Sequence, residues 1–255
     1  MGEFIKTEKT GRVLTITMER PHAMNALHAP ACHELSAVLD EFQADPGLWI
    51  GIITGAGDRA FCAGHDLATG FDHPMPATGW AGMAERNDIT KPLIGAVNGL
   101  AFGGGFEIAL CCDIVVADER ATFSMSEPLV GFVALGGGVQ RLGTRLPKSI
   151  AMELLLTGRR MSAEEALGLG IVSRVSPAGE VMGAARYFAD EMLKCSPLAL
   201  QFTKELAYEA MDGKAFTATI ATGRKRVGPA LRALEDTNEG IKAFLEKRKP
   251  VWQGR

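Results

Sequence analysis

The spacing of hydrophobic and polar residues changes from segment to segment along the chain, and the period in each segment predicts a helix or a strand. The segment Arg12–Arg20 alternates apolar with polar residues, as a half-exposed strand does. In His28–Gln43 the apolar residues recur at helical spacing, which predicts an amphipathic helix. Three short, continuous apolar runs predict buried strands: Trp49–Thr54, Pro92–Asn98 and Ile114–Ala117. Strands that alternate with helices indicate an α/β core.

After about residue 147 the pattern becomes mostly helical. Ser162 and Glu165 have the spacing of a capping box. Ser196-Pro197 predicts the start of a helix that runs to about Met211, and Leu231–Lys247 is a further amphipathic stretch. We therefore divide the chain into a core, residues 1–195, and a C-terminal helical region, residues 196–255. Within the core, Ala68–Met83 is rich in Gly, Pro, Thr and Asp, which predicts a surface loop that varies or moves.

Composition narrows the classes of function. The 255 residues are 47% hydrophobic, enough to bury one sizeable core. The formal net charge of -3 gives no basic excess, so we expect no nucleic-acid partner. The N-terminal residues lack the apolar stretch of a secretion signal, and no run approaches the ~18 apolar residues of a membrane helix. Five cysteines without a C-x-x-C pair fit a reduced, cytoplasmic protein, and no Cys/His cluster has the spacing of a metal site.

The most informative segment is Leu100–Asp113, LAFGGGFEIALCCD. Three successive glycines are unfavourable inside a helix and suit a sharp turn or a close approach to a ligand. A helix that begins there offers N–H groups and a positive dipole end, which stabilise developing negative charge on an oxygen. Glu107 would lie in its first turn and add a carboxylate for proton transfer. The same pattern also fits a glycine turn with a capping glutamate.

Two other segments have related chemistry. Phe61–Leu67 follows a predicted strand and a glycine turn, so its N–H groups are candidates for a second donor. Glu127 precedes the glycine cluster Gly136–Gly138. Two carboxylates in different environments are suited to paired acid/base chemistry, although spacing alone does not bring Glu107 and Glu127 together.

These motifs resemble those of the crotonase (enoyl-CoA hydratase/isomerase) family. Ala63–Leu67 (AGHDL) resembles the family's A-G-x-D-L segment, and Ala96–Glu107 resembles its A-V-x-G-x-A-x-G-G-G-x-E signature. Three later landmarks follow in the family's order: Gln140–Leu142, Thr157–Arg159 and Glu164–Val172. The resemblance covers nearly the whole chain. It implies a crotonase spiral of repeated ββα units and a C-terminal helical part that packs in a homotrimer or a dimer of trimers.

The resemblance also implies roles for individual residues. Glu107 and Glu127 fall on the family's two hydratase glutamates, and the N–H groups of His65 and Gly104 fall on its oxyanion hole. His65 stands where many relatives carry a small residue, a change that a backbone donor tolerates. The residues expected to contact coenzyme A are Ala23, Ala26, Ala63, Asp66 and Leu67.

The implied activity is the reversible syn addition of water to the 2,3 double bond of an enoyl-CoA, as in fatty acid metabolism. Glu107 would deprotonate the water and Glu127 would deliver a proton to Cα. Coenzyme A is part of the substrate, and we expect no further cofactor and no metal. Ala134 stands where the family usually has proline, which affects the expected shape of the acyl pocket more than the chemistry.

Other functions are compatible with parts of the sequence. Some stretches look particularly like carnitinyl-CoA dehydratases, and an enoyl-CoA isomerase is a further alternative within the family. A non-catalytic CoA-binding assembly protein would have no reason to retain both glutamates. Residues 55–60 fit G-x-G-x-x-A, but no apolar helical period follows, which disfavours a dinucleotide site. There is no G-x-S-x-G motif for a serine hydrolase.

Overall fold

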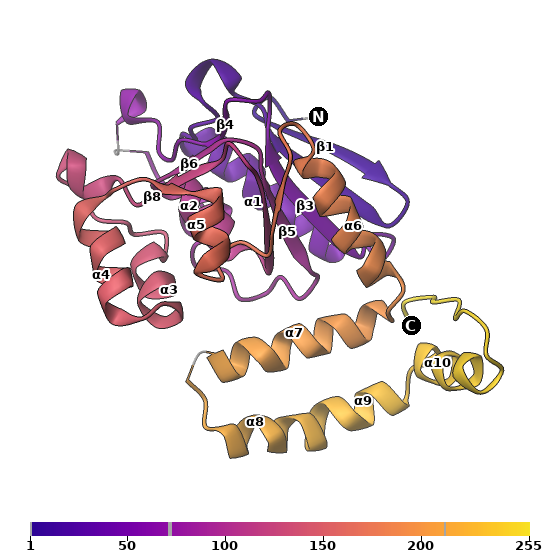
Figure 1. Ribbon diagram of the computed structural model, residues 1–255. Helices are drawn as coiled ribbons and strands as arrows, with labels where there is room; N and C mark the ends of the chain where they lie inside the picture. Colours follow the sequence, from indigo (N-terminus) through magenta and orange to yellow (C-terminus); the bar gives the residue numbers. More distant parts are fainter. Residues whose placement is uncertain (1, 71–72, 212) are drawn as a thin grey trace.

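The computed structural model describes residues 2–70, 73–211 and 213–255, and two sheets form its core (Figure 1). The larger sheet has the order β1-β2-β3-β5-β7-β10 and the smaller one β4-β6-β8-β9. The larger sheet consists of β1 (Ile5–Thr10), β2 (Val13–Met18), β3 (Ile50–Gly55), β5 (Leu93–Val97), β7 (Ile114–Asp118) and β10 (Arg174–Ser176). The smaller sheet consists of β4 (Ala60–Cys62), β6 (Leu100–Phe102), β8 (Thr122–Ser124) and β9 (Met161–Ser162).

The chain builds these sheets by winding through both of them in turn. Each of the consecutive pairs β3–β4, β5–β6 and β7–β8 places its first strand in the larger sheet and its second in the smaller one. Successive turns pair in parallel, with Ile52 opposite Ile94 in one sheet and Leu100 opposite Thr122 in the other. This is the spiral of ββα units that the resemblance implied, and the α/β prediction is confirmed.

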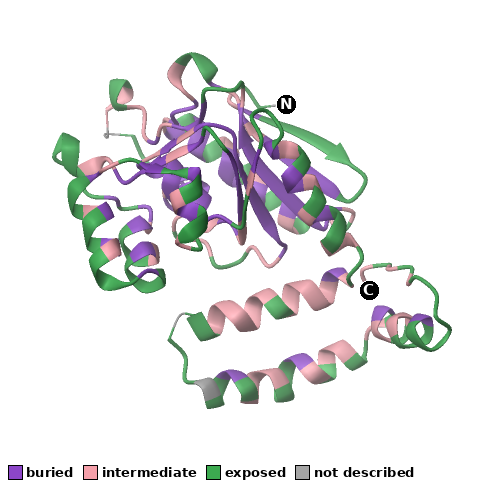
Figure 2. Ribbon diagram, viewed as in Figure 1, coloured by how far each residue is buried: buried purple, intermediate pink, exposed green. Residues whose placement is uncertain are grey.

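Helices cover both faces of the larger sheet, so its central strands are buried throughout. On one side, α1 (Ala29–Ala44) and α2 (Gly104–Cys111) share a core cluster with residues of β2, β3 and β5. On the other side, α6 (Val181–Leu193) packs on residues of the same strands. Burial on both faces explains why these strands read as continuous apolar runs in the sequence. Figure 2 shows the contrast between the buried strands and the exposed outer helices.

Along the chain, α3 (Gly138–Arg145), α4 (Lys148–Thr157) and α5 (Ala163–Gly168) come after β8 and before α6. The Ser162 hydroxyl caps α5 by accepting a hydrogen bond from the Glu165 N–H at 3.1 Å, so the predicted Ser cap is confirmed. The Glu165 carboxylate does not complete the capping box, because it pairs with the Arg159 guanidinium instead.

The C-terminal helices extend away from the sheets (Figure 1). They are α7 (Pro197–Met211), α8 (Phe216–Thr222), α9 (Gly228–Arg232) and α10 (Glu235–Leu245). The helix predicted from Ser196-Pro197 to Met211 is confirmed. The amphipathic stretch predicted at Leu231–Lys247 is mostly helical, and the extended Leu234 separates α9 from α10. Asp236, in the first turn of α10, accepts hydrogen bonds from the N–H groups of Gln253 and Gly254.

The segment from Ala68 to Met83 differs from a loose surface loop. Residues 71 and 72 lie outside the described residues. The short helices η2 (Leu67–Thr69) and η3 (Trp80–Gly82) flank them, and Ala81 and Gly82 are buried against α1. The composition therefore predicted irregular backbone correctly but missed its packing. None of the helices in the described ranges is both long and apolar enough to cross a bilayer.

Candidate active site

The glycine run places the start of α2 in close contact with neighbouring backbone. Gly103 precedes the helix with φ 53° and ψ −124°, a conformation that favours glycine. A Cβ placed on Gly105 would lie 1.8 Å from the Cys62 carbonyl oxygen, so only glycine allows the helix to approach β4. The Gly104 N–H belongs to the first turn, where no intrahelical acceptor exists. The prediction that the run forms a turn and then a helix is confirmed.

The segment that carries His65 lies against this helix start. Gly64 has φ +95°, and a Cβ there would lie 3.0 Å from the Gly104 nitrogen. His65 forms an isolated parallel bridge with Leu27, in which the Leu27 N–H binds the Gly64 oxygen and the Asp66 N–H binds the Leu27 oxygen. In such a bridge the N–H of His65 itself points away from Leu27. Its imidazole Nε2 lies 2.8 Å from the Gly70 oxygen, so the ring contacts the backbone of its own loop.

Glu107 is held inside the molecule by backbone N–H groups. Its side chain emerges from the first turn of α2, the residue is 4% exposed, and Oε1 accepts a hydrogen bond from the Gly138 N–H at 2.8 Å. Burial raises the pKa of Glu107, while backbone hydrogen bonds from Gly138 and Gly136 and the charge of Arg141 act in the opposite direction. The glycine cluster 136–138 therefore has a role that the sequence did not reveal: it leaves room for this carboxylate and donates to it.

Glu127 reaches the same place from the 3-10 helix η4 (Glu127–Val130). A Cβ placed on Gly103 would lie 3.1 Å from Glu127 Oε1, so the carboxylate faces the residue next to Gly104. Its Oε2 is buried and has no hydrogen-bond partner among the described residues. The pKa of Glu127 is raised to about 7, chiefly by burial and to a smaller extent by the negative charge of Glu107.

The start of α2 thus joins four residues that the sequence singled out separately. Gly103, the residue before Gly104, lies against the Glu127 carboxylate. The Gly104 nitrogen lies against Gly64, the residue before His65. Glu107 follows one turn later and interacts electrostatically with Glu127. A backbone donor together with two carboxylates of raised pKa is an arrangement suited to stabilising an oxyanion while moving protons.

The residues expected to contact coenzyme A lie in two adjoining strips, residues 23–26 and residues 63–67. Ala23 ends the short helix η1 (Pro21–Ala23), and Ala26 lies buried just beyond it. The Ala63 N–H donates to the Met24 oxygen at 3.0 Å, which joins this strip to the 63–67 segment. Leu67 is exposed, whereas the Asp66 carboxylate is turned inward and caps the Ala68 N–H at 3.2 Å.

Arg20 links these two strips through an ion pair and a hydrogen bond, which the sequence did not predict. Its guanidinium pairs with Asp66 at 2.9 Å and also donates to the Ala26 oxygen. The pair is mostly buried, and the hydrogen bond from Arg20 lowers the pKa of Asp66 against the effect of burial. Such a cross-link between residues 20 and 66 leaves no periodic signal in a single sequence.

A separate cavity of about 550 Å³ lies at the other end of α2, lined by residues of α3 and α7. Three of its polar side chains bind neighbouring residues: Lys204 and Tyr208 both bind Asp113 at 2.8 Å, and Arg145 donates to the Leu110 oxygen. We place the candidate site at the start of α2 because the two carboxylates of raised pKa gather there. Within the described ranges, no three His, Cys, Asp or Glu side chains group so as to hold a metal ion.

Comparisons with known proteins identify the family of this chain. A family model described as "Enoyl-CoA hydratase/isomerase" matches residues 8–255. A carnitinyl-CoA dehydratase from Proteus mirabilis is 42% identical over 262 residues that span the whole of both chains. An enoyl-CoA hydratase structure from Mycobacterium marinum has a TM-score of 0.91 at 39% identity, covering 99% of this chain and 100% of that one. Another from Mycobacterium tuberculosis has a TM-score of 0.92 at 38% identity, covering 99% of each chain.

Full-length matches at this identity show that the chain shares the family of these proteins and not only their fold. The family consists of acyl-CoA-processing enzymes of the lyase type. The chain belongs to the enoyl-CoA hydratase/isomerase family.

Proposed function

We propose that the protein catalyses the reversible syn addition of water across the 2,3 double bond of an enoyl-CoA thioester. One observation carries this proposal: Glu107 and Glu127 both lie at the start of α2, next to the Gly104 N–H. An acid and a base beside an oxyanion donor are what hydration of a conjugated thioester requires.

The thioester oxygen would lie between the N–H groups of His65 and Gly104. Attack of water at Cβ moves negative charge onto that oxygen, and one preorganised donor in such a site is worth roughly 3 to 4 kcal/mol. Glu107 takes a proton from the water as its oxygen bonds to Cβ. Glu127 gives its proton to Cα, and proton transfer from Glu107 to Glu127 restores the starting state. Dehydration follows the same steps in reverse.

The contacts with coenzyme A would come from the strips that Arg20 joins. Ala23, Ala26 and Ala63 are small residues beside the thioester site, and Asp66 and Leu67 continue toward the exposed surface. Coenzyme A enters as part of the substrate, and the proton transfers above use only side chains of this chain. We infer no additional cofactor.

We also infer a homotrimer or a dimer of trimers, with residues 196–255 supplying contacts between subunits. Support comes from α10, where Ile241, Phe244 and Leu245 are 58%, 83% and 73% exposed on a region that extends away from the core (Figure 2). Light scattering on the purified protein tests this assembly. A cytoplasmic location is part of the same proposal and agrees with five cysteines that are all free.

Carnitinyl-CoA is a second candidate substrate. Relatives that are 42% identical over the full length bear the name carnitinyl-CoA dehydratase. The same two glutamates would serve dehydration of a carnitinyl thioester, so the two candidates differ in the acyl group and share the chemistry. Parallel assays with crotonyl-CoA and carnitinyl-CoA separate them.

The decisive experiment measures hydration of crotonyl-CoA by the wild-type protein and by the Glu107→Gln/Glu127→Gln double variant. We expect turnover by the wild type and none above background by the variant, which should keep its circular dichroism spectrum. Equal rates for the two proteins would refute the proposed site. Isomerisation of a 3-enoyl-CoA without any hydration would refute the proposed reaction.

A further inference from the structure

Trp80 lies directly against the proposed oxyanion donor. A Cβ placed on Gly104 would lie 2.3 Å from the Trp80 Cη2 atom and 2.6 Å from its Cζ2 atom. The benzo edge of the indole therefore covers Gly104, whereas Glu127 covers the neighbouring Gly103. Any acyl group bound between Gly104 and the two glutamates has the indole beside it.

The turn that carries Trp80 has an unusual backbone. Gly79, Ala81 and Gly82 have φ of 81°, 56° and 65°, so a non-glycine residue adopts a left-handed conformation there. Ala81 is fully buried, and a Cβ on Gly82 would lie 2.6 Å from the backbone of Ser36. Such strain persists only where the surroundings over-determine the conformation. The turn is therefore held in place by its packing on α1.

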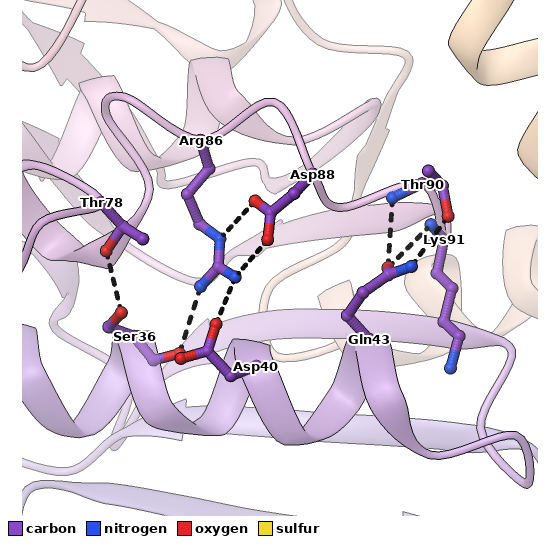
Figure 3. A network of polar contacts seen from close by, with 8 residues as sticks. All are labelled: Ser36, Asp40, Gln43, Thr78, Arg86, Asp88, Thr90 and Lys91. Atoms are coloured by element: carbon purple, nitrogen blue, oxygen red, sulfur yellow. Dashed lines mark hydrogen bonds and ion pairs between the residues drawn. The ribbon is translucent and has the colours of Figure 1, made fainter.

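Polar contacts on both sides of Trp80 add to this packing (Figure 3). Before it, the Thr78 hydroxyl lies 2.8 Å from the Ser36 hydroxyl. After it, Arg86 donates to the Ser36 carbonyl oxygen and pairs with Asp40 and Asp88. The Arg86 side chain is only 4% exposed, whereas the Asp40 and Asp88 carboxylates that it pairs with are 62% and 55% exposed.

Further along, the same segment remains attached to α1. The Gln43 amide donates to the Thr90 hydroxyl at 2.9 Å and accepts from the Thr90 N–H at 3.1 Å (Figure 3). Lys91 donates to the Phe42 carbonyl oxygen at 2.7 Å. Together these contacts fix the segment from residue 78 to residue 91, and with it the position of the indole.

We propose that Trp80 is a specificity-determining residue that restricts the site to short acyl chains. The inference rests on the function proposed above, because it assumes that the thioester lies at Gly104. A rigid aromatic side chain beside Cα and Cβ leaves little room for a long chain, and the contacts on α1 prevent the turn from moving aside. Steric selection of this kind in a hydrophobic pocket is typically worth 10- to 200-fold for a methylene.

Trp80→Phe is a suitable control because of the surroundings of the indole nitrogen. Trp80 Nε1 is buried and has no hydrogen-bond partner among the described residues, so a Trp80→Phe variant breaks no bond while keeping an aromatic ring. Trp252 provides a matched tryptophan elsewhere, since its Nε1 donates to the Lys194 oxygen in the C-terminal region.

The experiment compares kcat/KM for but-2-enoyl-, hex-2-enoyl- and dec-2-enoyl-CoA. The wild type should prefer the four-carbon substrate, and Trp80→Ala should raise the ten-carbon to four-carbon ratio by about tenfold or more. Trp80→Phe and Trp252→Ala should keep the wild-type ratio within about threefold, because neither removes the aromatic ring beside Gly104. A wild type that already prefers ten carbons would overturn the proposal, as would a Trp80→Phe profile that matches that of Trp80→Ala.

Calorimetric binding of acetyl-, hexanoyl- and decanoyl-CoA gives a second readout that needs no turnover. Trp80→Ala, or Trp80→Leu if the alanine variant does not fold, should bind decanoyl-CoA about tenfold more tightly relative to acetyl-CoA than the wild type does. An unchanged binding order would refute the role of Trp80 even in an active enzyme. Absence of wild-type turnover on every enoyl-CoA would instead refute the proposed function, while binding would still report on Trp80.

Discussion

Glu107 and Glu127 lie at one site, but their carboxylates have different surroundings. Glu107 is 4% exposed and accepts a hydrogen bond from the Gly138 N–H at 2.8 Å, with a further one from the backbone of Gly136. Glu127 is half-buried, and its Oε2 has no partner among the described residues. Backbone donors from Gly138 and Gly136 stabilise the ionised form of Glu107, whereas at Glu127 desolvation and the charge of Glu107 outweigh one backbone hydrogen bond and favour the neutral form.

This difference supports the two roles proposed for Glu107 and Glu127. Burial raises both pKa values, but at Glu107 the donors and the charge of Arg141 oppose the effect. At Glu127 burial and the charge of Glu107 together raise the pKa to about 7. When the pair holds one proton, these effects favour that proton on Glu127. Groups whose environments separate their pKa values in this way form an acid/base pair.

The largest expected effect comes from removing either member of the pair. Glu107→Gln and Glu127→Gln should each lower kcat for crotonyl-CoA hydration by about 10³-fold, the usual scale of acid–base catalysis. KM should change little, because a glutamine keeps the shape of the side chain. Steady-state kinetics on both variants check this. If one variant kept near-parental kcat, catalysis would depend on a single carboxylate and the comparison of roles would fail.

A smaller loss is expected when Glu107 is displaced. A Cβ on Gly138 would lie 3.0 Å from Glu107 Cγ and 2.6 Å from the Met125 methyl carbon, so Gly138→Ala should push the carboxylate out of position. Displacements of about 1 Å can cost up to about 100-fold in rate, and we expect a loss of about 30-fold in kcat.

Gly143→Ala is the matched control for this prediction. Gly143 lies in the same helix, α3, and a Cβ there meets no atom within 4 Å. That variant should keep wild-type kcat. Equal losses in the two variants would indicate a general effect on α3 and not a specific effect on Glu107.

The fold was largely predictable from the sequence because its strongest signals are local. The apolar runs at β3, β5 and β7 predicted buried strands, and the periodic residues of α1 predicted a helix on the sheet. Strain and tertiary contacts were not predictable in this way. The left-handed Ala81 and the inward turn of Asp236 depend on residues far away in the sequence.

The parts of the site that lie within one sequence motif were predictable. The parts that depend on contacts between distant segments were not. The glycine run and Glu107 are adjacent in the sequence, so their geometry follows from a helix start. The meeting of Glu107 with Glu127, the clamp of Arg20 on Asp66 and the position of Trp80 on Gly104 each join distant segments. No period or spacing in a single sequence records such pairings.

The pH dependence of activity sharpens the comparison. The reaction needs one proton shared by the pair, so kcat/KM should fall about tenfold per pH unit above about 7, where Glu127 loses its proton. Hydration and dehydration should fall in parallel, because water addition takes up no net proton. Profiles of both directions between pH 6 and 9 check this, and the residual activity of Glu127→Gln should lack the alkaline decline. An alkaline limb of the same midpoint in that variant would assign it to another group.

The smallest expected effect is on stability. The folded-state pKa of Glu127 is raised to about 7 from an ordinary value of 4.5, so ionisation of the native protein costs free energy that the unfolded chain does not pay. Wild-type stability should decline as the pH rises from about 4.5 to 7 and stay lower above that. Glu127→Gln avoids this cost, and its free energy of unfolding at pH 8 should exceed that of the wild type by about 1 to 2 kcal/mol, allowing for partial exposure. Urea denaturation at pH 8 and pH 5 measures the difference, which should largely disappear at the lower pH. A gain of equal size at both pH values would show that packing, and not the buried charge, distinguishes Glu127 from Glu107.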